Sequence, residues 1–100
     1  MDAKQKADKA LRVFGEIKRA GLSGGEETQA FEARITRALS SLSLEEQYTI
    51  RRIYVEGMTN EEAAEADDCD TSTVSRRKKR ALSRVAIILY TDQYIRDGGL

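Results

Sequence analysis

The sequence predicts a small all-α domain of about five helices, containing a helix-turn-helix whose second helix is long and C-terminal. Apolar residues recur at every third or fourth position along most of the chain, which is the period of a helix with one buried side. The chain has no proline, and its glycines fall mostly between the periodic segments, where helices start and stop. Its 100 residues suffice for one small domain with a modest core.

The composition excludes several classes of protein. No apolar run approaches the roughly 18 residues of a membrane-spanning helix, so no membrane association is expected. The N-terminus lacks the hydrophobic region of a secretion signal, and Cys69, the single cysteine, cannot form an internal disulfide. We therefore expect a cytoplasmic protein. Without histidine the chain offers no zinc site and no thiol–imidazole pair, so we expect neither an enzyme nor a cofactor or metal.

Two helices are predicted in the first part of the chain. Residues 3–20 carry one apolar stripe, and residues 26–39 carry another. The stripes consist of Ala7, Ala10, Leu11, Phe14 and Ile17, and of Phe31, Ile35, Ala38 and Leu39. The glycine-rich residues 21–25 separate the helices and lack the lysine and the glycine spacing of a phosphate-binding loop. We expect residues 1–37 to form an N-terminal helical extension of a domain that spans residues 38–100.

Two capping boxes mark the next two helices. Ser43 with Glu46, and Thr59 with Glu62, have the spacing at which a hydroxyl and a carboxylate satisfy the first free amides of a helix. The first of these helices carries Ile50, Ile53 and Tyr54 on its apolar side and ends near Gly57. The second is short, and its inner side consists of Ala63, Ala64 and Ala66. Such small side chains allow the following helix to cross closely.

The last helix is predicted to begin after a cap at Asp70 or Thr71 and to run to Tyr94, with Gly98 and Gly99 beyond its end. Its core stripe consists of Val74, Ala81, Leu82, Val85, Ile88 and Leu89. Lys78 falls on the same side and must extend its ammonium group outward. A second apolar line, Ile87, Tyr90 and Tyr94, requires another partner. Either the N-terminal helices cover this line or it forms the contact of a homodimer.

Charge is distributed unevenly although the formal net charge is zero, with 17 basic and 17 acidic residues. Residues 56–70 contain seven acids and no base, whereas residues 76–84 contain six bases and no acid. Hydroxyl and cationic side chains lie opposite the core stripe of the last helix: Thr71, Ser72, Ser75, Arg76 and Lys79, with Arg77, Arg80 and Arg84 beside them. These cations could simply be solvated and have no partner. Against this alternative, the helix dipole disfavours cations in the first half of a helix, which is where they lie.

This side of the last helix suits a DNA major groove. Short hydroxyls near the helix N-terminus let the backbone approach closely, and Arg76 can bind guanine O6 and N7 together. Lys79, Arg80 and Arg84 are better placed for backbone phosphates, which set affinity and salt dependence but carry no sequence information.

The turn between the two helices of the motif is acidic, with Asp67, Asp68 and Asp70. Three accounts of these carboxylates stay open: they weaken non-specific DNA binding, they pair with the basic helix in the free protein, or they form a protein-contact surface. Cys69 occupies an apolar position in the turn, and we expect a small buried core residue there rather than a redox switch.

From Ala38 to Val85 the chain resembles region 4 of the sigma-70 family factors. Residues 42–47 (Leu-Ser-Leu-Glu-Glu-Gln) and 51–57 (Arg-Arg-Ile-Tyr-Val-Glu-Gly) look like the first helix of that domain and its exit. Residues 58–65 (Met-Thr-Asn-Glu-Glu-Ala-Ala-Glu) resemble its supporting helix, and residues 72–82 (Ser-Thr-Val-Ser-Arg-Arg-Lys-Lys-Arg-Ala-Leu) its recognition helix. Phage and plasmid regulators, including small late-gene activators of the ArpU type, share this motif.

The resemblance implies a stand-alone transcription regulator that reads duplex DNA with a recognition helix over residues 71–84, acts in a bacterial or phage-infected cell, and contacts RNA polymerase. Carried over residue by residue, the base contacts fall on Ser72, Ser75 and Arg76. Separately from the resemblance, we expect contacts with the DNA backbone from Thr71, Thr73, Arg77, Lys79, Arg80 and Arg84. The chain departs from the family where Asp67 replaces a large apolar residue and Asp68 replaces glycine. The alternative function is a protein-interaction module, such as a polymerase-binding, sigma-binding or phage packaging adaptor, with little affinity for DNA.

Overall fold

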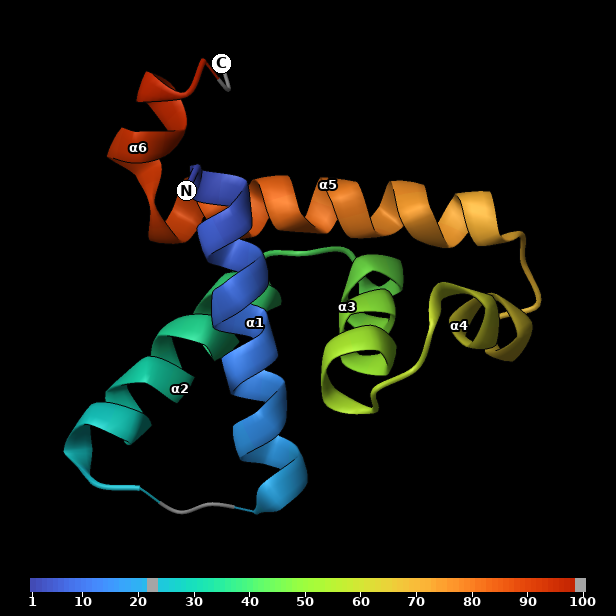
Figure 1. Ribbon diagram of the computed structural model, residues 1–100, viewed down its shortest axis with the longest axis horizontal. Helices are drawn as coiled ribbons and strands as arrows, with labels where there is room; N and C mark the ends of the chain where they lie inside the picture. Colours follow the sequence, from blue (N-terminus) through green and yellow to red (C-terminus); the bar gives the residue numbers. More distant parts are fainter. Residues whose placement is uncertain (22–23, 99–100) are drawn as a thin grey trace.

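A computed structural model describes residues 1–21 and 24–98, and over these ranges the chain is helical and contains no strand (Figure 1). The predicted all-α class is therefore confirmed. The elements are α1 (Ala3–Ala20), α2 (Glu26–Ser40), α3 (Leu44–Ile50), the π-helical turn η1 (Arg51–Val55), α4 (Asn60–Ala66), α5 (Thr71–Leu89) and α6 (Thr91–Arg96). None of the described helices is long and apolar enough to cross a membrane. The linker interpretation of residues 21–25 and the expected end at Gly99 fall partly outside the described residues.

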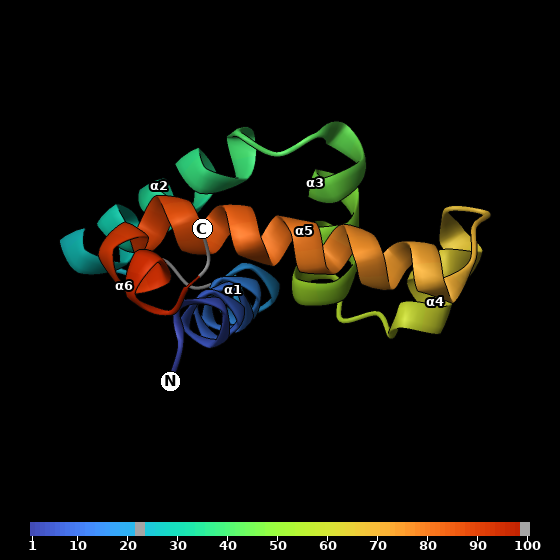
Figure 2. The ribbon, with the colours of Figure 1, turned by 90° about the horizontal axis from the view of Figure 1, so that it is seen from above.

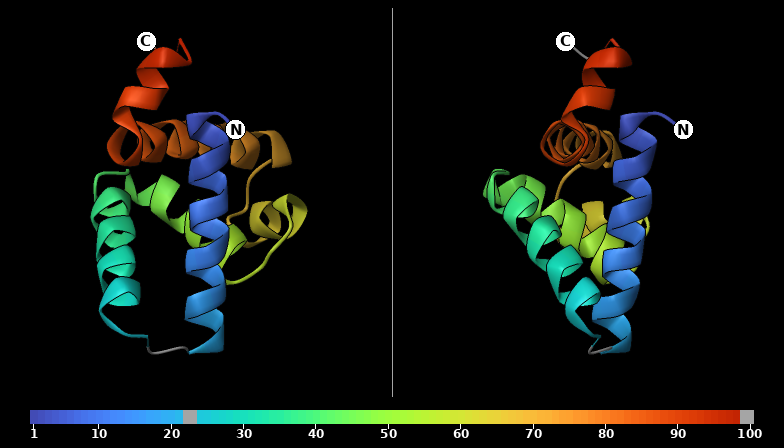
Figure 3. Two further views of the ribbon diagram at one scale, coloured as in Figure 1. Left: turned by 60° about the vertical axis from the view of Figure 1, so that its left-hand side comes forward. Right: turned by 90° about the vertical axis from the view of Figure 1, so that its left-hand side faces the viewer.

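The long helix α5 organises the molecule. It lies across one end of the other helices, with α1 crossing it on one side and α2 and α3 packed on the other (Figures 1 and 2). Helices α1 and α2 both extend from α5 toward the same side of it (Figure 3). The short α4 lies beside the N-terminal end of α5, and α6 turns away from its C-terminal end.

Local capping explains where the helices begin. Both predicted capping boxes are formed: the Ser43 hydroxyl accepts from the Glu46 amide, and the Thr59 hydroxyl accepts from the Glu62 amide. Asp2 forms a third box with Gln5 at the start of α1. Each box satisfies amides that have no partner inside their helix.

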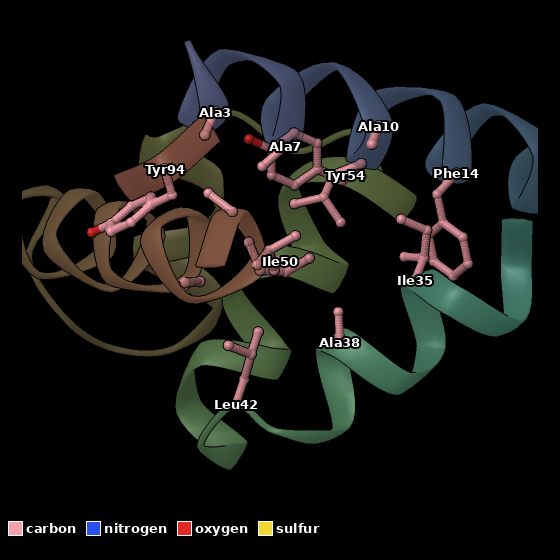
Figure 4. Packing of buried hydrophobic residues seen from close by; sticks show 14 residues of the cluster. Ala3, Ala7, Ala10, Phe14, Ile35, Ala38, Leu42, Ile50, Tyr54 and Tyr94 are labelled. Carbon is pink, nitrogen blue, oxygen red and sulfur yellow. The ribbon is translucent and has the colours of Figure 1, made fainter. Parts of the chain in front are cut away.

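The main core brings the two ends of the chain together. Apolar residues of α1, from Ala3 to Phe14, pack against Ile35, Ile50 and Tyr54 (Figure 4). The same cluster contains Ala81, Val85 and Ala86 of α5 and Tyr94 of α6. The expected boundary between residues 37 and 38 falls inside α2, and residues on both of its sides contribute to this single cluster.

The last helix is shorter than predicted. The helix ends at Leu89 because Tyr90 adopts φ −135° and ψ 48°, and α6 then starts in a new direction. This break allows α6 to pack against the beginning of α1. The Ala3 amide donates to the Asp97 carboxylate at 2.7 Å, and the Gln93 side-chain amide donates to the Met1 carbonyl at 2.6 Å.

The break also changes which side chains of the C-terminal helices are covered. Tyr94 is buried in the core and Tyr90 is half-buried against it, so the N-terminal part of the chain covers most of the second apolar line. Of the two alternatives for this line, Tyr94 therefore follows coverage by the N-terminal helices and is not available for a homodimer contact. Ile88, predicted to be in the core, is 43% exposed, and Ala86 is buried instead. In α4, Ala63 and Ala64 are buried as predicted, but Ala66 is exposed because it faces away from α5.

The helix from Leu44 does not stay regular to its end. It widens into η1, and the chain leaves this turn at Gly57, whose φ of 74° lies in the left-handed region. The Tyr54 carbonyl of η1 projects toward α1, where Arg19 Nη1 donates to it at 2.5 Å. A Cβ atom on Gly15 would lie only 1.8 Å from the same oxygen. The absence of a side chain at Gly15 therefore lets α1 touch η1 directly.

Candidate nucleic-acid interface

Helices α4 and α5 form a helix-turn-helix around a small core of their own. Ala63, Ala64 and Val74 are buried together, with Met58 and Ile53 packed against them. The chain turns between the two helices through hydrogen bonds from the Asp67 and Cys69 amides to carbonyls of α4. The small alanine side chains keep α4 close to the start of α5, so the opposite side of α5 faces outward.

The acidic turn is fixed by an ion pair with η1. The Asp67 carboxylate lies 2.9 Å from Arg52 Nη2, and the two side chains are 17% and 28% exposed. In the described part of the chain, no ion pair joins a turn carboxylate to a base of α5. An ion pair to η1 thus stands at the position where the family usually has a large apolar residue. Pairing of the turn carboxylates with the basic helix is not observed in the described residues.

Asp68 takes the backbone conformation for which glycine is usual. Its φ is 52°, the one positive φ at a residue other than glycine in the described residues. Aspartate tolerates this region better than most residues because its short side chain can bond locally. The turn therefore keeps its shape without glycine, at a cost in backbone strain.

Most of the predicted contact residues lie on the open side of α5. Exposed among them are Thr71, Ser72, Arg76, Lys79, Arg80 and Arg84, while Thr73 and Ser75 are half-buried. The Arg76 guanidinium is 3.3 Å from the Thr73 hydroxyl, so it lies along the helix surface and can be extended without breaking a core contact. The hydroxyl-bearing first turn and the cations of the next two turns share this side.

Arg77 differs from its neighbours because it turns toward α3. Its side chain is only 18% exposed, with Nη2 3.6 Å from the Glu45 carboxylate and Nη1 4.0 Å from the sulfur of Cys69. It thus connects α5, the turn and the start of α3. Cys69, expected to be buried, is half-buried beside this guanidinium.

Lys78 lies on the core side of α5, as predicted, but its ammonium group contacts the Tyr54 ring where an outward extension was expected. Its Nζ lies 5.7 Å from the centre of the Tyr54 ring, and the side chain is half-buried. The Tyr54 hydroxyl donates to the Asp8 carboxylate at 2.5 Å, and Arg12 pairs with the same carboxylate at 2.9 Å. The Lys78 ammonium therefore lies over a tyrosine ring of the core, close to the Asp8–Arg12 pair of α1.

The cluster of Tyr54, Asp8 and Arg12 shifts two pKa values. Burial, followed by the hydrogen bond to Asp8, raises the pKa of Tyr54 far above its ordinary value. Partial burial acts to raise the pKa of Asp8, but hydrogen bonds from Tyr54 and Arg12 outweigh it, so that pKa is lowered. The sequence analysis missed this cluster. Its one local signal is the spacing of Asp8 and Arg12 by one helical turn, because Tyr54 joins through tertiary packing.

A second exposed feature lies on α3. Leu44 is 65% exposed and Tyr48 is 50% exposed, one turn apart on the same side of the helix. Tyr48 also borders a mainly apolar pocket of about 290 Å³ between α1, α2 and α3, which Phe14, Leu39 and Val55 help to line. Over the described ranges, no group of three or more histidine, cysteine or carboxylate side chains could hold a metal ion.

Comparison with known families agrees with this geometry. Residues 32–85 match the model of the family described as sigma-70, region 4, which starts six residues earlier than the resemblance at Ala38. Comparisons with curated proteins and with solved structures gave no match. The family consists of helix-turn-helix domains with DNA-binding and regulatory roles and is not a family of enzymes. Because the match covers more than half of the chain, including α3, α4 and most of α5, this protein belongs to the sigma-70 region 4 family.

Proposed function

We propose that this protein is a transcription regulator that binds specific duplex DNA by placing the N-terminal half of α5 in a major groove. The observation that carries the proposal is the two-sided character of α5. Val74, Ala81 and Val85 are fully buried, while the opposite side presents the exposed Ser72, Arg76 and Lys79. A helix held in this way by a helix-turn-helix offers its first turns to base edges.

In this proposal one group of residues contacts base edges and another contacts backbone phosphates. Arg76 reads a guanine through O6 and N7, and Ser72 and Ser75 bind neighbouring base edges. The phosphates on either side of the groove are bound by the remaining side chains: Thr71, Thr73, Lys79, Arg80 and Arg84. Arg77 contributes mainly by holding α5 to α3, because its guanidinium already faces Glu45.

The proposal includes a contact with RNA polymerase through α3. Its exposed Leu44 and Tyr48 and the neighbouring apolar pocket lie apart from the DNA-facing side of α5. The same surface supports the second candidate function, a protein-interaction module with little affinity for DNA. The two functions predict different behaviour toward duplex DNA.

Selection of bound sequences from a random duplex pool, followed by binding titrations with Arg76→Ala, tests the proposal. We expect one enriched site, and we expect the variant to bind it with about 1–3 kcal/mol less free energy and with relaxed preference at one base pair. Lys9→Ala, which removes an exposed cation from α1, is the control and should bind like the wild type. No enrichment, together with no duplex binding at low salt, would favour the protein-interaction module.

A further inference from the structure

A second basic surface continues from α5 onto α2. We call it the arginine strip, and it consists of Arg80 and Arg84 on α5 and Arg34 and Arg37 on α2, all of them exposed. The α2 pair was not among the residues that the sequence indicated as contacts. Figure 2 shows α1 and α2 on opposite sides of α5, and the contact of Arg84 with the end of α2 puts this arginine on the α2 side.

One hydrogen bond joins the two halves of the strip. Arg84 Nη1 donates to the carbonyl of Ser41, the residue that caps the C-terminal end of α2, at 3.4 Å. Arg34, Arg37 and Ser41 are spaced three and four residues apart, so they share one side of α2. Arg80 precedes Arg84 by one helical turn. Arg84 therefore lies at the C-terminal end of α2, the end that carries Arg37 and, one turn earlier, Arg34.

The charge of the arginine strip is not neutralised by its surroundings. Among the ion pairs of the described residues, none involves these four arginines. Neither residues 33–43 nor residues 71–91 contain an acid. The nearby Glu45 is paired with Arg77. In a chain of zero net charge, such a concentration of free arginines marks a surface for a polyanion.

We infer that the arginine strip binds the phosphate backbone of duplex DNA outside the major groove that α5 reads. This inference rests on the proposed function. Arg84 lies about 20 Å along the helix from Thr71, so the strip begins where the groove-reading turns end. Guanidinium groups suit the purpose because they bind phosphate oxygens in a bidentate manner. The protein then covers a longer duplex than its recognition helix alone requires.

Salt-dependent binding of Arg34→Ala/Arg37→Ala tests the inference. On the selected site within a duplex of about three helical turns, we expect about tenfold weaker binding at ~0.1 M salt. We also expect the slope of log K against log salt to fall by about 2, since each phosphate contact contributes about 0.9. Base preference should not change. Arg34→Lys/Arg37→Lys, which keeps the charge, should recover most of the slope.

Two further measurements separate this inference from its alternatives. Lys4→Ala/Lys9→Ala removes the same charge from exposed positions of α1, across α5 from the strip, and should leave the slope unchanged. A duplex shortened to the selected site should bind wild type and the α2 variant equally.

If Arg76→Ala weakens binding while Arg34→Ala/Arg37→Ala matches the wild type on the long duplex, the strip does not bind DNA and an acidic protein surface becomes its partner. An equal loss of slope in the α1 control would also overturn the inference, because the effect would then be one of net charge. Failure of the wild type to bind any duplex would overturn the proposed function as well.

Discussion

At the scale of single residues, Asp68 combines a side chain with a backbone conformation that usually requires glycine. It stands where the family usually has glycine, and it keeps the left-handed conformation with φ 52° that the turn requires. A side chain in this region costs roughly 1–2 kcal/mol for most residues and less for aspartate, whose carboxylate can bond to nearby backbone. The neighbouring Asp67 is tied down by Arg52, so the turn has an anchor that the family pattern lacks.

We expect Asp68→Gly to raise the free energy of unfolding by about 0.5 kcal/mol. Glycine removes the strain at positive φ, but it also gains freedom in the unfolded chain, which offsets part of the benefit. Asp68→Val should instead lower stability, since β-branched residues fit this region poorly. Urea unfolding of both variants measures the difference. A stability order with valine above glycine would show that the turn does not hold this conformation in solution.

At the scale of elements, a direct backbone contact between α1 and η1 determines how α1 packs. Its residue Gly15 lies against the Tyr54 carbonyl of η1, in a contact that leaves no room for a methyl group. The π-helical widening of η1 places this carbonyl outside the regular helical ladder, where Arg19 binds it. Helix propensity alone would favour alanine at this position by about 1 kcal/mol. The contact between elements therefore opposes the local preference of α1.

Gly15→Ala should destabilise the protein by about 2 kcal/mol or more, because the added Cβ would displace the backbone of η1. Thermal or urea unfolding measures this loss. Gly25→Ala is a matched control: a Cβ there would meet no atom within 4 Å, and the expected change is below about 1 kcal/mol. Equal effects of the two substitutions would contradict the direct contact between α1 and η1.

At the scale of the whole molecule, the N-terminal helices share a core with the C-terminal half of α5, while the start of α5 packs with α4 in a separate small core. Asp8 of α1 accepts a hydrogen bond from Tyr54 of η1, and Lys78 of α5 lies over the same ring. The pKa of Asp8 is lowered in the folded state, so its contribution to stability is present above its unfolded pKa. That contribution is lost as the pH falls through the folded pKa.

The pH dependence of unfolding tests this connection. In the wild type we expect the unfolding free energy to fall between about pH 5 and about pH 2, and Asp8→Asn should make this fall shallower. Tyr54→Phe removes one of the hydrogen bonds that lower the pKa of Asp8, so it should give an intermediate slope. Urea unfolding at several pH values measures these slopes. If the unfolding free energy of wild type and Asp8→Asn depends on pH in the same way, ionisation of Asp8 does not contribute to the stability of the fold.

Sequence patterns that extend over a few residues were sufficient to predict much of the fold. The bounds of α1, both predicted capping boxes and the outward side of α5 follow from apolar period and from cap spacing, and the structure has them. The end of α5 could not be predicted in this way. Ile87, Tyr90 and Tyr94 continue an apolar helical period, and only packing against α1 breaks the helix at Tyr90.

The sequence by itself determined the all-α class, the position of the helix-turn-helix and the side of α5 that faces outward, because these depend on local spacing. The tertiary structure determines the partners of the charged side chains that do not face outward from α5. It paired Asp67 with Arg52, turned Arg77 toward Glu45, and covered Lys78 with Tyr54. It also brought Arg84 to the end of α2, the helix that carries Arg34 and Arg37. Such pairings join residues distant in the chain, and a linear period carries no information about which helices will meet.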